Sequence, residues 1–357
     1  MTPAKVAIIG AGPVGCALAL DLERCGVPVV LCTRRRPGVG VPAALPLRPI
    51  ALSHASRLIL ERIGAWNVLE PTPIRTIHVS QAGAFGRTRI AAEDAGVPAL
   101  GYVLDYDALS AALFELLGGR GIAIAEEPPS AALLVHAEGS APEAGGKDYR
   151  QEALVTLVRT DPASSGTAYE RFTREGPLAL LPLDGRYAVV WAMAPDRAAE
   201  LASADERSFL AALGAAFGER AGAFVAADER FRIPLTLRVR ASRTGVREAY
   251  VGNTAQMLHP VAGQGLNLGL RDAWDLARLL QDARDPGDAQ LLARFAATRR
   301  LDAMATIRVT DLLAGAFTGD SALHAAARSA AMTALDACSP ARRFFARRMI
   351  FGPSAIP

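Results

Sequence analysis

Apolar and polar positions alternate in two ways along the first third of the chain. A short apolar run at 5–9 predicts a buried strand, and apolar residues at helical spacing over 16–25 predict a helix that Gly26 ends. A second apolar run at 27–32 predicts another strand. The sequence therefore predicts a strand–helix–strand unit, followed by a Pro-, Gly- and Arg-rich loop over 34–49 and a helix over 53–63.

The later pattern predicts a different architecture, inserted into the first. Strand-like stretches occur at 152–159, 176–182 and 187–193, with a helix over 205–217. A strand, a glycine loop and a long amphipathic helix return over 250–280, and 291–351 is mostly helical. We expect one discontinuous domain (1–75, 99–150 and 247–300), an inserted sheet domain (76–98 and 151–246) and a C-terminal helical region (301–357).

Composition narrows the class of protein. The chain has 357 residues, 51% of them hydrophobic, which is ample for a large core. A net charge of +3 gives no argument for nucleic acid as a partner. The four cysteines (Cys16, Cys25, Cys32 and Cys338) have no metal-ligand spacing, so we expect no metal. No apolar run reaches a membrane span and the chain enters a strand pattern at once, so we expect a cytoplasmic protein, or a peripheral one on the inner membrane face.

The first glycine turn, 10–15, fits GxGxxG between a predicted strand and a predicted helix. Gly10 allows the tight turn, Gly12 lets a pyrophosphate approach the backbone, and Gly15 lets helix and strand pack closely. The helix N-terminus then presents free N–H groups to the phosphates. In this context the turn predicts dinucleotide binding.

The end of the second strand departs from that pattern. An acid usually binds the ribose there, but this chain has Thr33, followed by Arg34, Arg35 and Arg36. Thr33 still offers a neutral hydroxyl to a ribose. The arginines either attract a phosphate or form a solvated loop, and we favour the solvated loop.

A second glycine loop, within 250–272, is the most informative stretch. A strand leads through a polar turn to Pro260, Gly263 and Gly265, and then to a helix. Such a loop brings backbone N–H groups and a helix N-terminus to one point, as a flavin requires at N1 and its C2 carbonyl. An ordinary connection would not need this length or these glycines.

This stretch closely resembles the GD-type motif of the class A flavin monooxygenases, in their ubiquinone-biosynthesis branch. Other segments are similar to the same family: 48–53, 168–173, 176–182, 216–218, 233–235 and 339–342. The resemblance implies an α/β fold with a Rossmann-like FAD-binding domain, of the glutathione-reductase type and similar to p-hydroxybenzoate hydroxylase. It also implies an inserted β-sheet substrate domain and a C-terminal helical region.

The resemblance further implies the chemistry. NAD(P)H reduces FAD, O2 adds to give a C4a-hydroperoxyflavin, and a hydroxyl group passes to the ring of a polyprenylated phenol in ubiquinone biosynthesis. Together with the pattern of the first glycine turn, the resemblance predicts these FAD-binding residues: Gly10, Gly12, Gly15, Thr33, Arg48, Glu138, Gly139, Gly252, Asn253, Pro260, Gly263, Gly265, Leu266 and Asn267.

Three departures from the family cluster around one cofactor face. Glu138 stands where the family has Asp, and Tyr106 stands where many relatives have a basic residue. The chain is also shortened, so we expect it to pass directly from a strand near 121–125 to one near 132–136. We favour an active enzyme. The alternative is a degenerate, non-catalytic or weakly FAD-binding scaffold of a quinone-biosynthesis complex.

The role of His259 and the position of the C-terminal segment each have two possible interpretations. His259 either reaches the substrate or packs within its loop, and packing is favoured, so no catalytic base is predicted. The C-terminal segment interleaves arginines with apolar residues. It lies either on an anionic membrane surface or docked on the body of the protein with its arginines in water.

Overall fold

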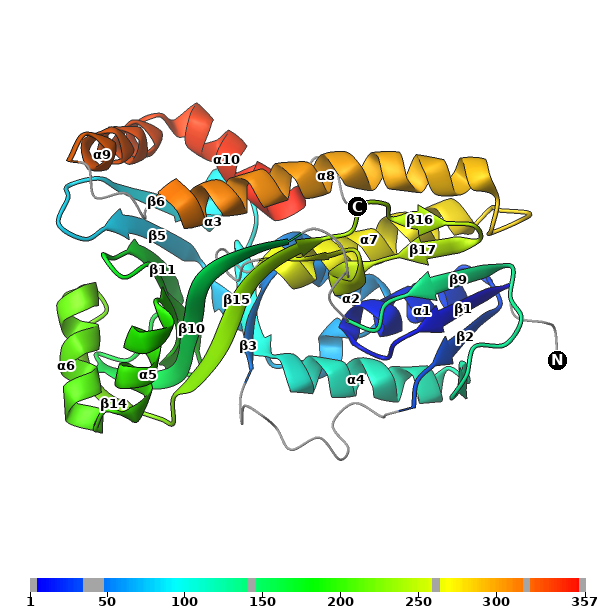
Figure 1. Ribbon diagram of the computed structural model, residues 1–357, viewed down its shortest axis with the longest axis horizontal. Helices are drawn as coiled ribbons and strands as arrows, with labels where there is room; N and C mark the ends of the chain where they lie inside the picture. Colours follow the sequence, from blue (N-terminus) through cyan, green and yellow to red (C-terminus); the bar gives the residue numbers. More distant parts are fainter. Residues whose placement is uncertain (1–4, 35–47, 140–145, 259–263, 317–321, 353–357) are drawn as a thin grey trace.

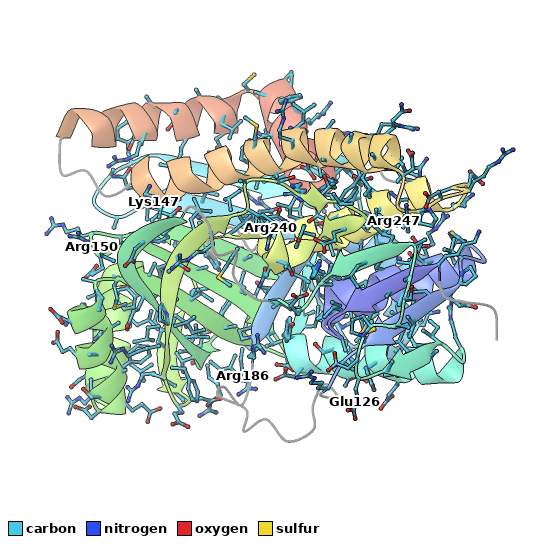
Figure 2. The ribbon with its side chains drawn as sticks, turned by 45° about the vertical axis from the view of Figure 1, so that its right-hand side comes forward. Glu126, Lys147, Arg150, Arg186, Arg240 and Arg247 are labelled. Carbon is cyan, nitrogen blue, oxygen red and sulfur yellow. The ribbon has the colours of Figure 1, made fainter. Side chains whose placement is uncertain are left out.

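The computed structural model describes residues 5–34, 48–139, 146–258, 264–316 and 322–352. Figure 1 shows two sheets side by side, with one long helix running above both. Charged side chains such as Arg150, Arg186 and Glu126 lie at the periphery (Figure 2).

The six-stranded sheet contains the strand–helix–strand unit expected at the start of the chain. β1 (Val6–Ile9) pairs in parallel with β2 (Val29–Cys32) on one side and β9 (Leu133–His136) on the other. The strand order is β16-β17-β9-β1-β2-β8. The remaining strands are β8 (Ala123–Ala125), β16 (Thr244–Gly245) and β17 (Glu248–Tyr250).

Several helices share one core with this sheet, among them α1 (Pro13–Arg24), α4 (Tyr106–Gly119) and α7 (Gln264–Leu280). Leu18 and Leu22 lie one helical turn apart on α1 and join the buried cluster that contains Ile8 of β1. α1 ends at Arg24 and Gly26 follows with φ +72°, a conformation that favours glycine. The packed sheet and helices hold the first turn of α1 beside the ends of the parallel strands.

The second sheet has nine strands. Its order is β18-β15-β10-β13-β12-β11-β5-β6, and β14 pairs with β10. β5 (Thr76–Gln81) joins in parallel with β11 (Thr167–Phe172), although the two are far apart in sequence. The other strands are β6 (Arg87–Ala91), β10 (Gly146–Asp161), β12 (Pro177–Leu183), β13 (Arg186–Met193), β14 (Ala223–Ala227), β15 (Phe231–Val239) and β18 (Gln256–Met257).

A small third sheet joins the two large ones, in the order β3-β7-β4. Its strands are β3 (Pro49–Ser53), β4 (Thr72–Ile74) and β7 (Gly101–Asp105). Ser53 caps α2 (His54–Arg62) by accepting a hydrogen bond from the Ser56 N–H. Short helical turns complete this part: α3 (Ala92–Ala95), η1 (Trp66–Val68) and η2 (Gly252–Thr254).

The remaining helices cover the nine-stranded sheet and span the molecule. α5 (Pro195–Ser203) and α6 (Glu206–Phe217) pack on one face of the sheet. α8 (Ala289–Ala316), α9 (Ala322–Ala337) and α10 (Ser339–Phe351) follow in sequence, with α8 as the long upper helix (Figure 1). Hydrogen bonds from β6 hold α9: the Thr88 hydroxyl donates to the Met332 carbonyl and the Arg89 N–H to Asp336.

Most sequence expectations are confirmed at the level of elements. The α/β class is confirmed, and the chain runs from β8 to β9 without an intervening strand, as expected for the shortened segment. The loop expected over 34–49 is one residue too long, because Pro49 already pairs with Asp105 in β3. Among the described helices, none is long and apolar enough to cross a membrane.

Candidate functional site

One cavity of about 720 Å³ lies between the two large sheets. At one end it is lined by the N-termini of α1 and α7 and by the η2 turn. At the other end it is lined by the nine-stranded sheet and by α9 and α10. A ligand can therefore lie against the glycine turns while a second molecule occupies the apolar end.

Two helix N-termini open onto this cavity. Gly12 is the N-cap of α1, and no side chain caps the first turn there. Gly12, Pro13 and Val14 line the cavity, as do Gln264 and Gly265 at the start of α7. Uncapped N–H groups and a positive dipole end attract anionic groups such as a pyrophosphate or the charged edge of a reduced flavin.

The glycines of the first turn divide into two kinds. A Cβ on Gly10 would lie 2.5 Å from the Ala137 backbone, and one on Gly15 would lie 2.0 Å from the Gly10 carbonyl oxygen. These two glycines allow close packing. A Cβ on Gly12 would instead project into the cavity, with the Tyr106 hydroxyl as its nearest neighbour at 3.6 Å. The open backbone at Gly12 fits a pyrophosphate.

The second glycine loop shows the same division. A Cβ on Gly252 of η2 would meet Val14 of α1 at 3.2 Å, and one on Gly269 of α7 would meet it at 2.7 Å, so these glycines let η2 and α7 pack onto α1. A Cβ on Gly265 would meet no atom within 4 Å of the described structure. Gly265 thus leaves space beside the first turn of α7, where Leu266 also lines the cavity, and this space fits a flavin edge.

A buried carboxylate fixes this arrangement. Asp272 of α7 accepts hydrogen bonds from the Gly252 N–H at 3.1 Å and from Gln256 Nε2 at 2.9 Å. It also accepts from Arg299 of α8 at 2.7 Å and from Arg243 at 3.2 Å. Burial raises the pKa of Asp272, but the two guanidinium groups and Gln256 outweigh it and hold this pKa below its usual value.

A cation–aromatic stack borders the first glycine turn. The Arg48 guanidinium lies 4.1 Å from the centre of the Tyr106 ring, and both residues line the cavity. The Arg48 N–H donates to Asp105 and its carbonyl accepts from the Tyr106 N–H. Tyr106 brings no charge to this part of the cavity, and Arg48 supplies a positive charge beside it.

Glu138 and Gly139 lie just beyond the end of β9, and both line the cavity. His136 Nδ1 lies 3.4 Å from the Glu138 carboxylate, and the His136 ring stacks on Tyr250 at 4.6 Å. Burial raises the pKa of Glu138, but hydrogen bonds from His136 and from backbone N–H groups outweigh burial. The pKa of Glu138 therefore lies below its usual value. Glu138 is therefore held as an anion in a fixed place.

Some predicted residues lie elsewhere or have other partners. Thr33 follows the end of β2, where its N–H donates to Ala125, and it is not among the described residues that line the cavity. Arg34 is exposed and pairs with Glu127, as expected of a solvated loop, whereas Arg35 and Arg36 lie outside the described residues. The Asn267 amide lines the cavity but binds Ser53, Ser56 and Ala51. His259, Pro260 and Gly263 lie outside the described residues.

The apolar end of the cavity has walls from both sides. The sheet contributes Ile77, Val79, Ala168, Ala179, Leu181 and Val190, and the C-terminal helices contribute Met332, Leu335, Phe345, Met349 and Ile350. Glu170 of β11 lines the cavity among these residues. Glu170 is a site residue that the motifs did not predict, although it stands two residues from Ala168 and from Phe172 and so shares their side of a strand.

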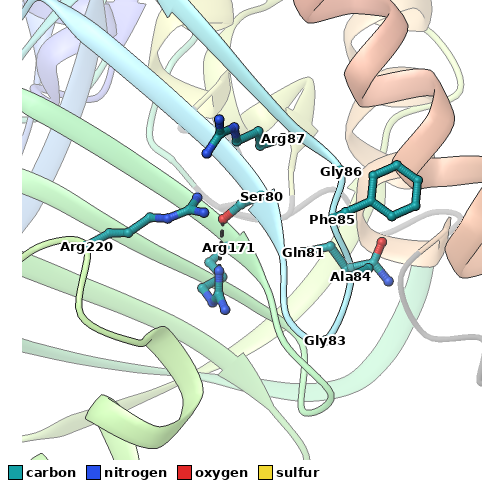
Figure 3. A pocket seen from close by; sticks show the side chains of 9 residues that line it. All are labelled: Ser80, Gln81, Gly83, Ala84, Phe85, Gly86, Arg87, Arg171 and Arg220. Carbon is teal, nitrogen blue, oxygen red and sulfur yellow. Dashed lines mark hydrogen bonds between the residues drawn. The ribbon is translucent and has the colours of Figure 1, made fainter.

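A second hollow, of about 460 Å³, lies beside the turn between β5 and β6 and shares no described lining residue with the first cavity. Figure 3 shows the guanidinium groups of Arg87, Arg171 and Arg220 around Ser80. Arg171 donates to Ser80 and to the Ala216 carbonyl near the end of α6. Among the described residues, no group of His, Cys, Asp and Glu side chains could hold a metal ion.

Comparison with known proteins agrees with this geometry. Residues 135–310 match the family model described as an FAD binding domain. The chain is 32% identical to ubiquinone hydroxylase UbiL of Rhodospirillum rubrum, over 96% of this chain and 89% of that protein. It is 28% identical to 3-demethoxyubiquinol 3-hydroxylase of Escherichia coli, over 84% and 86% of the two chains.

Solved structures share the fold at low sequence identity. p-Nitrophenol 4-monooxygenase PnpA of Pseudomonas putida is similar with a TM-score of 0.78 and 15% identity, covering 99% of both chains. HpxO of Klebsiella pneumoniae, complexed with FAD and uric acid, gives 0.72 and 16%, covering 98% of this chain and 97% of that one. The chain thus belongs to the class A FAD-dependent monooxygenase family, in the branch that contains the ubiquinone hydroxylases.

Proposed function

We propose that this protein hydroxylates the aromatic ring of a polyprenylated phenol in ubiquinone biosynthesis, using O2 and FAD that NAD(P)H reduces. One observation carries the proposal. The cavity of about 720 Å³ runs from open glycines at two helix N-termini to a chamber with apolar walls. The named activities of the UbiL and 3-demethoxyubiquinol relatives support the substrate class.

Residues at the glycine end would hold the cofactor. We assign the pyrophosphate to Gly12 and the first turn of α1, beside the Arg48–Tyr106 stack. Glu138 and Gly139 would contact the same cofactor from the end of β9. Gly252, Asn253 and the first turn of α7 would hold the isoalloxazine ring. When bound and reduced, FAD supplies the activation of O2 for transfer of one oxygen atom to the ring.

The protein contributes position, charge and dryness. The α7 N-terminus stabilises negative charge on the flavin edge, an effect worth about 0.3–2 kcal/mol for a helix end. The apolar walls exclude water, which strengthens those electrostatic contacts and protects reactive species from hydrolysis. The apolar lining of the far chamber suits a polyprenyl chain attached to the ring.

We further propose a cofactor domain (1–75, 99–150 and 247–300) around the six-stranded sheet and a substrate domain (76–98 and 151–246) around the nine-stranded sheet, followed by the helical region 301–357. Two short strands cross these bounds, because β16 pairs in the six-stranded sheet and β18 in the nine-stranded sheet. β5 and β6 share a sheet with β10–β15 despite their separation in sequence, which supports this division. The cavity lies between the two sheets. Reaction would then occur where cofactor and substrate domains meet.

Peripheral membrane contact is a part of this proposal that α10 supports. The inner side of α10 packs Phe345, Ala346 and Ile350 toward the cavity and the helix docks through an Arg342–Asp94 pair. On its outer side Phe344 is 74% exposed, and the exposed Arg343 and Arg347 lie on the same helix. Such a surface suits anionic lipid, from which a polyprenylated phenol would come.

Gly12→Val tests the proposed function, because a valine there would project into the cavity. Gly12 has φ −71°, which valine can adopt, so we expect a folded protein with at least tenfold weaker FAD binding. The matched control is Gly10→Val, at φ +109° against the Ala137 backbone, which should instead destabilise the fold. Flavin absorbance and thermal melting separate the two effects.

Product formation completes this test. Parent protein with FAD and NAD(P)H should convert a prenylated phenol to its hydroxylated product, detected by mass spectrometry. If the parent binds no FAD, or binds FAD and forms no product with any prenylated phenol, the scaffold function replaces the hydroxylase. If Gly12→Val binds FAD as tightly as the parent, the assignment of this turn to the pyrophosphate is wrong.

A further inference from the structure

Glu170 stands in the middle of β11, on the side of the strand that faces the large cavity. Side chains alternate along a strand, so Ala168, Glu170 and Phe172 share one side, and all three line the cavity. The next residue, Arg171, lies on the opposite side, at the arginine hollow of Figure 3. The strand therefore directs one carboxyl toward the chamber.

The neighbours of Glu170 across the sheet are apolar. Its partner in β5 is Val79 and its partner in β12 is Ala179. Thr88 and Val190 extend the same row on either side, and the Thr88 hydroxyl is already bonded to Met332 of α9. Ala331, Met332 and Leu335 of α9 also line the cavity. Among the described lining residues, the other charged ones are Arg48 and Glu138, both at the glycine end.

One oxygen of the Glu170 carboxyl lacks a protein partner. This atom, Oε1, is buried and has no hydrogen-bond partner among the described residues. Burial raises the pKa of Glu170 to about 7, and no neighbouring charge of the described structure contributes. A buried carboxyl without a partner destabilises a protein, and a structural carboxyl such as Asp272 has its hydrogen bonds satisfied. This geometry fits a group whose partner is a ligand.

We propose that Glu170 is a catalytic residue, the base that accepts the phenolic proton of the bound substrate. The inference rests on the proposed function and deepens it. The phenol O–H bond breaks, its electron pair stays on oxygen as phenolate, and the proton forms an O–H bond on Glu170. After oxygen transfer, the C–H bond at the hydroxylated carbon breaks, its electron pair restores the aromatic ring, and its proton neutralises the oxygen left on the donor. Glu170 then returns its own proton to the original phenolate oxygen. This exchange needs no further co-reactant.

The environment of Glu170 suits this role. A phenolate donates more electron density to its ring than a phenol does, which favours attack on an electrophilic oxygen. An ordinary glutamate, with a pKa of about 4.3, is a weak base toward a phenol of pKa about 10. The pKa of Glu170 lies closer to that of the phenol and close to neutral pH, where a general base is most effective.

Glu170→Gln tests the assignment with two readouts. The first is the ultraviolet difference spectrum of a prenylated phenol bound to the FAD-loaded enzyme, which reports phenolate without turnover. The second is the rate of ring hydroxylation against pH. The matched control is Glu115→Gln, which removes a carboxylate from the exposed side of α4. Glu170→Asp keeps a carboxyl and tests recovery.

In the parent, bound phenol should ionise at a lower pH than free phenol, and the hydroxylation rate should rise as pH passes through about 7. Glu170→Gln should bind FAD normally, lose both effects and hydroxylate about 10²–10⁴-fold more slowly. Glu170→Asp should recover part of the rate, and Glu115→Gln should match the parent.

If Glu170→Gln ionises bound phenol and hydroxylates it like the parent, the inference is wrong while the proposed function stands. If the parent itself neither binds nor hydroxylates a prenylated phenol, the proposed function fails and the inference fails with it. The parent assay therefore distinguishes the two failures.

Discussion

The two faces of the nine-stranded sheet are built from the same strands but have different roles. One face packs against helices, and the other lines the cavity. The face under α5 and α6 is filled by large side chains such as Tyr187, Trp191 and Phe209 in one buried cluster. The cavity face has smaller residues at the intervening positions, Ala168, Ala179 and Val190 among them. Small residues leave space and large ones fill it, so the alternation of a strand decides which face is core and which is binding site.

Trp191→Ala should give the largest effect on stability. Trp191 is fully buried in the cluster under α5 and α6, and its indole N–H donates to Thr173. Truncation should lower the free energy of unfolding by about 3–5 kcal/mol. Leu181→Ala, on the partly exposed cavity face, should cost clearly less. Urea denaturation of both variants checks this, and equal losses would contradict the distinction between the faces.

Glu170→Gln should increase stability, in the opposite direction to most core substitutions. The folded-state pKa of Glu170 is raised to about 7, so its protonated form is favoured in the folded protein. The stability of the folded protein linked to this protonated carboxyl is present in full below about pH 4.3, the pKa of glutamate in the unfolded chain. This stability is lost as pH rises through about 7, the pKa in the folded protein. At pH 8 the variant should be more stable than the parent by about 1–3 kcal/mol.

The pH dependence of the Glu170→Gln gain provides the control. The gain should shrink toward zero near pH 4, where both states of the parent carry a protonated carboxyl. Unfolding at a series of pH values measures it. A gain that does not change between pH 4 and pH 8 would show that the Glu170 carboxyl does not titrate as described.

Ala179→Phe should have the smallest effect on stability and a large effect on ligand binding. Ala179 lines the cavity beside Glu170, so the ring can occupy empty space and should cost less than overpacking in a filled core, which costs about 1–3 kcal/mol. FAD binding should persist while affinity for a prenylated phenol falls at least tenfold. Ala198→Phe, in the packed cluster, should instead destabilise by about 1–3 kcal/mol. Calorimetric titration and melting curves test the pair.

Local sequence signals predicted the elements that hold the cofactor end. Gly10, Gly12 and Gly15 stand between a predicted strand and a predicted helix, which is the pattern of a dinucleotide-binding turn. In the structure, Gly10 and Gly15 allow close packing, and Gly12 leaves the backbone open to the cavity. Ser53 caps α2, which begins at His54, one residue after the predicted start. These features depend on a few consecutive residues, so a sequence is sufficient to find them.

Features that depend on distant partners were not predictable in the same way. β4 and β7 pair across 30 residues in a third sheet that the apolar pattern did not indicate. Thr33 was predicted to bind cofactor, but the described cavity does not reach it. Glu170 resembles any exposed strand glutamate until β5, β12 and α9 are placed around it. Burial of a charged residue is a tertiary property, and only its same-side neighbours Ala168 and Phe172 gave a local signal.

The parallel pairing of β11 with β5 also sets the chemistry of the chamber. Glu170 and Arg171 are adjacent and lie on opposite sides of one strand. A register error of one residue would exchange them, putting a guanidinium among apolar walls and a carboxyl beside Arg87 and Arg220. Misfolded protein of this kind would retain its strand content and lose its proton acceptor, so correct registration of β11 is a condition for catalysis as much as for folding.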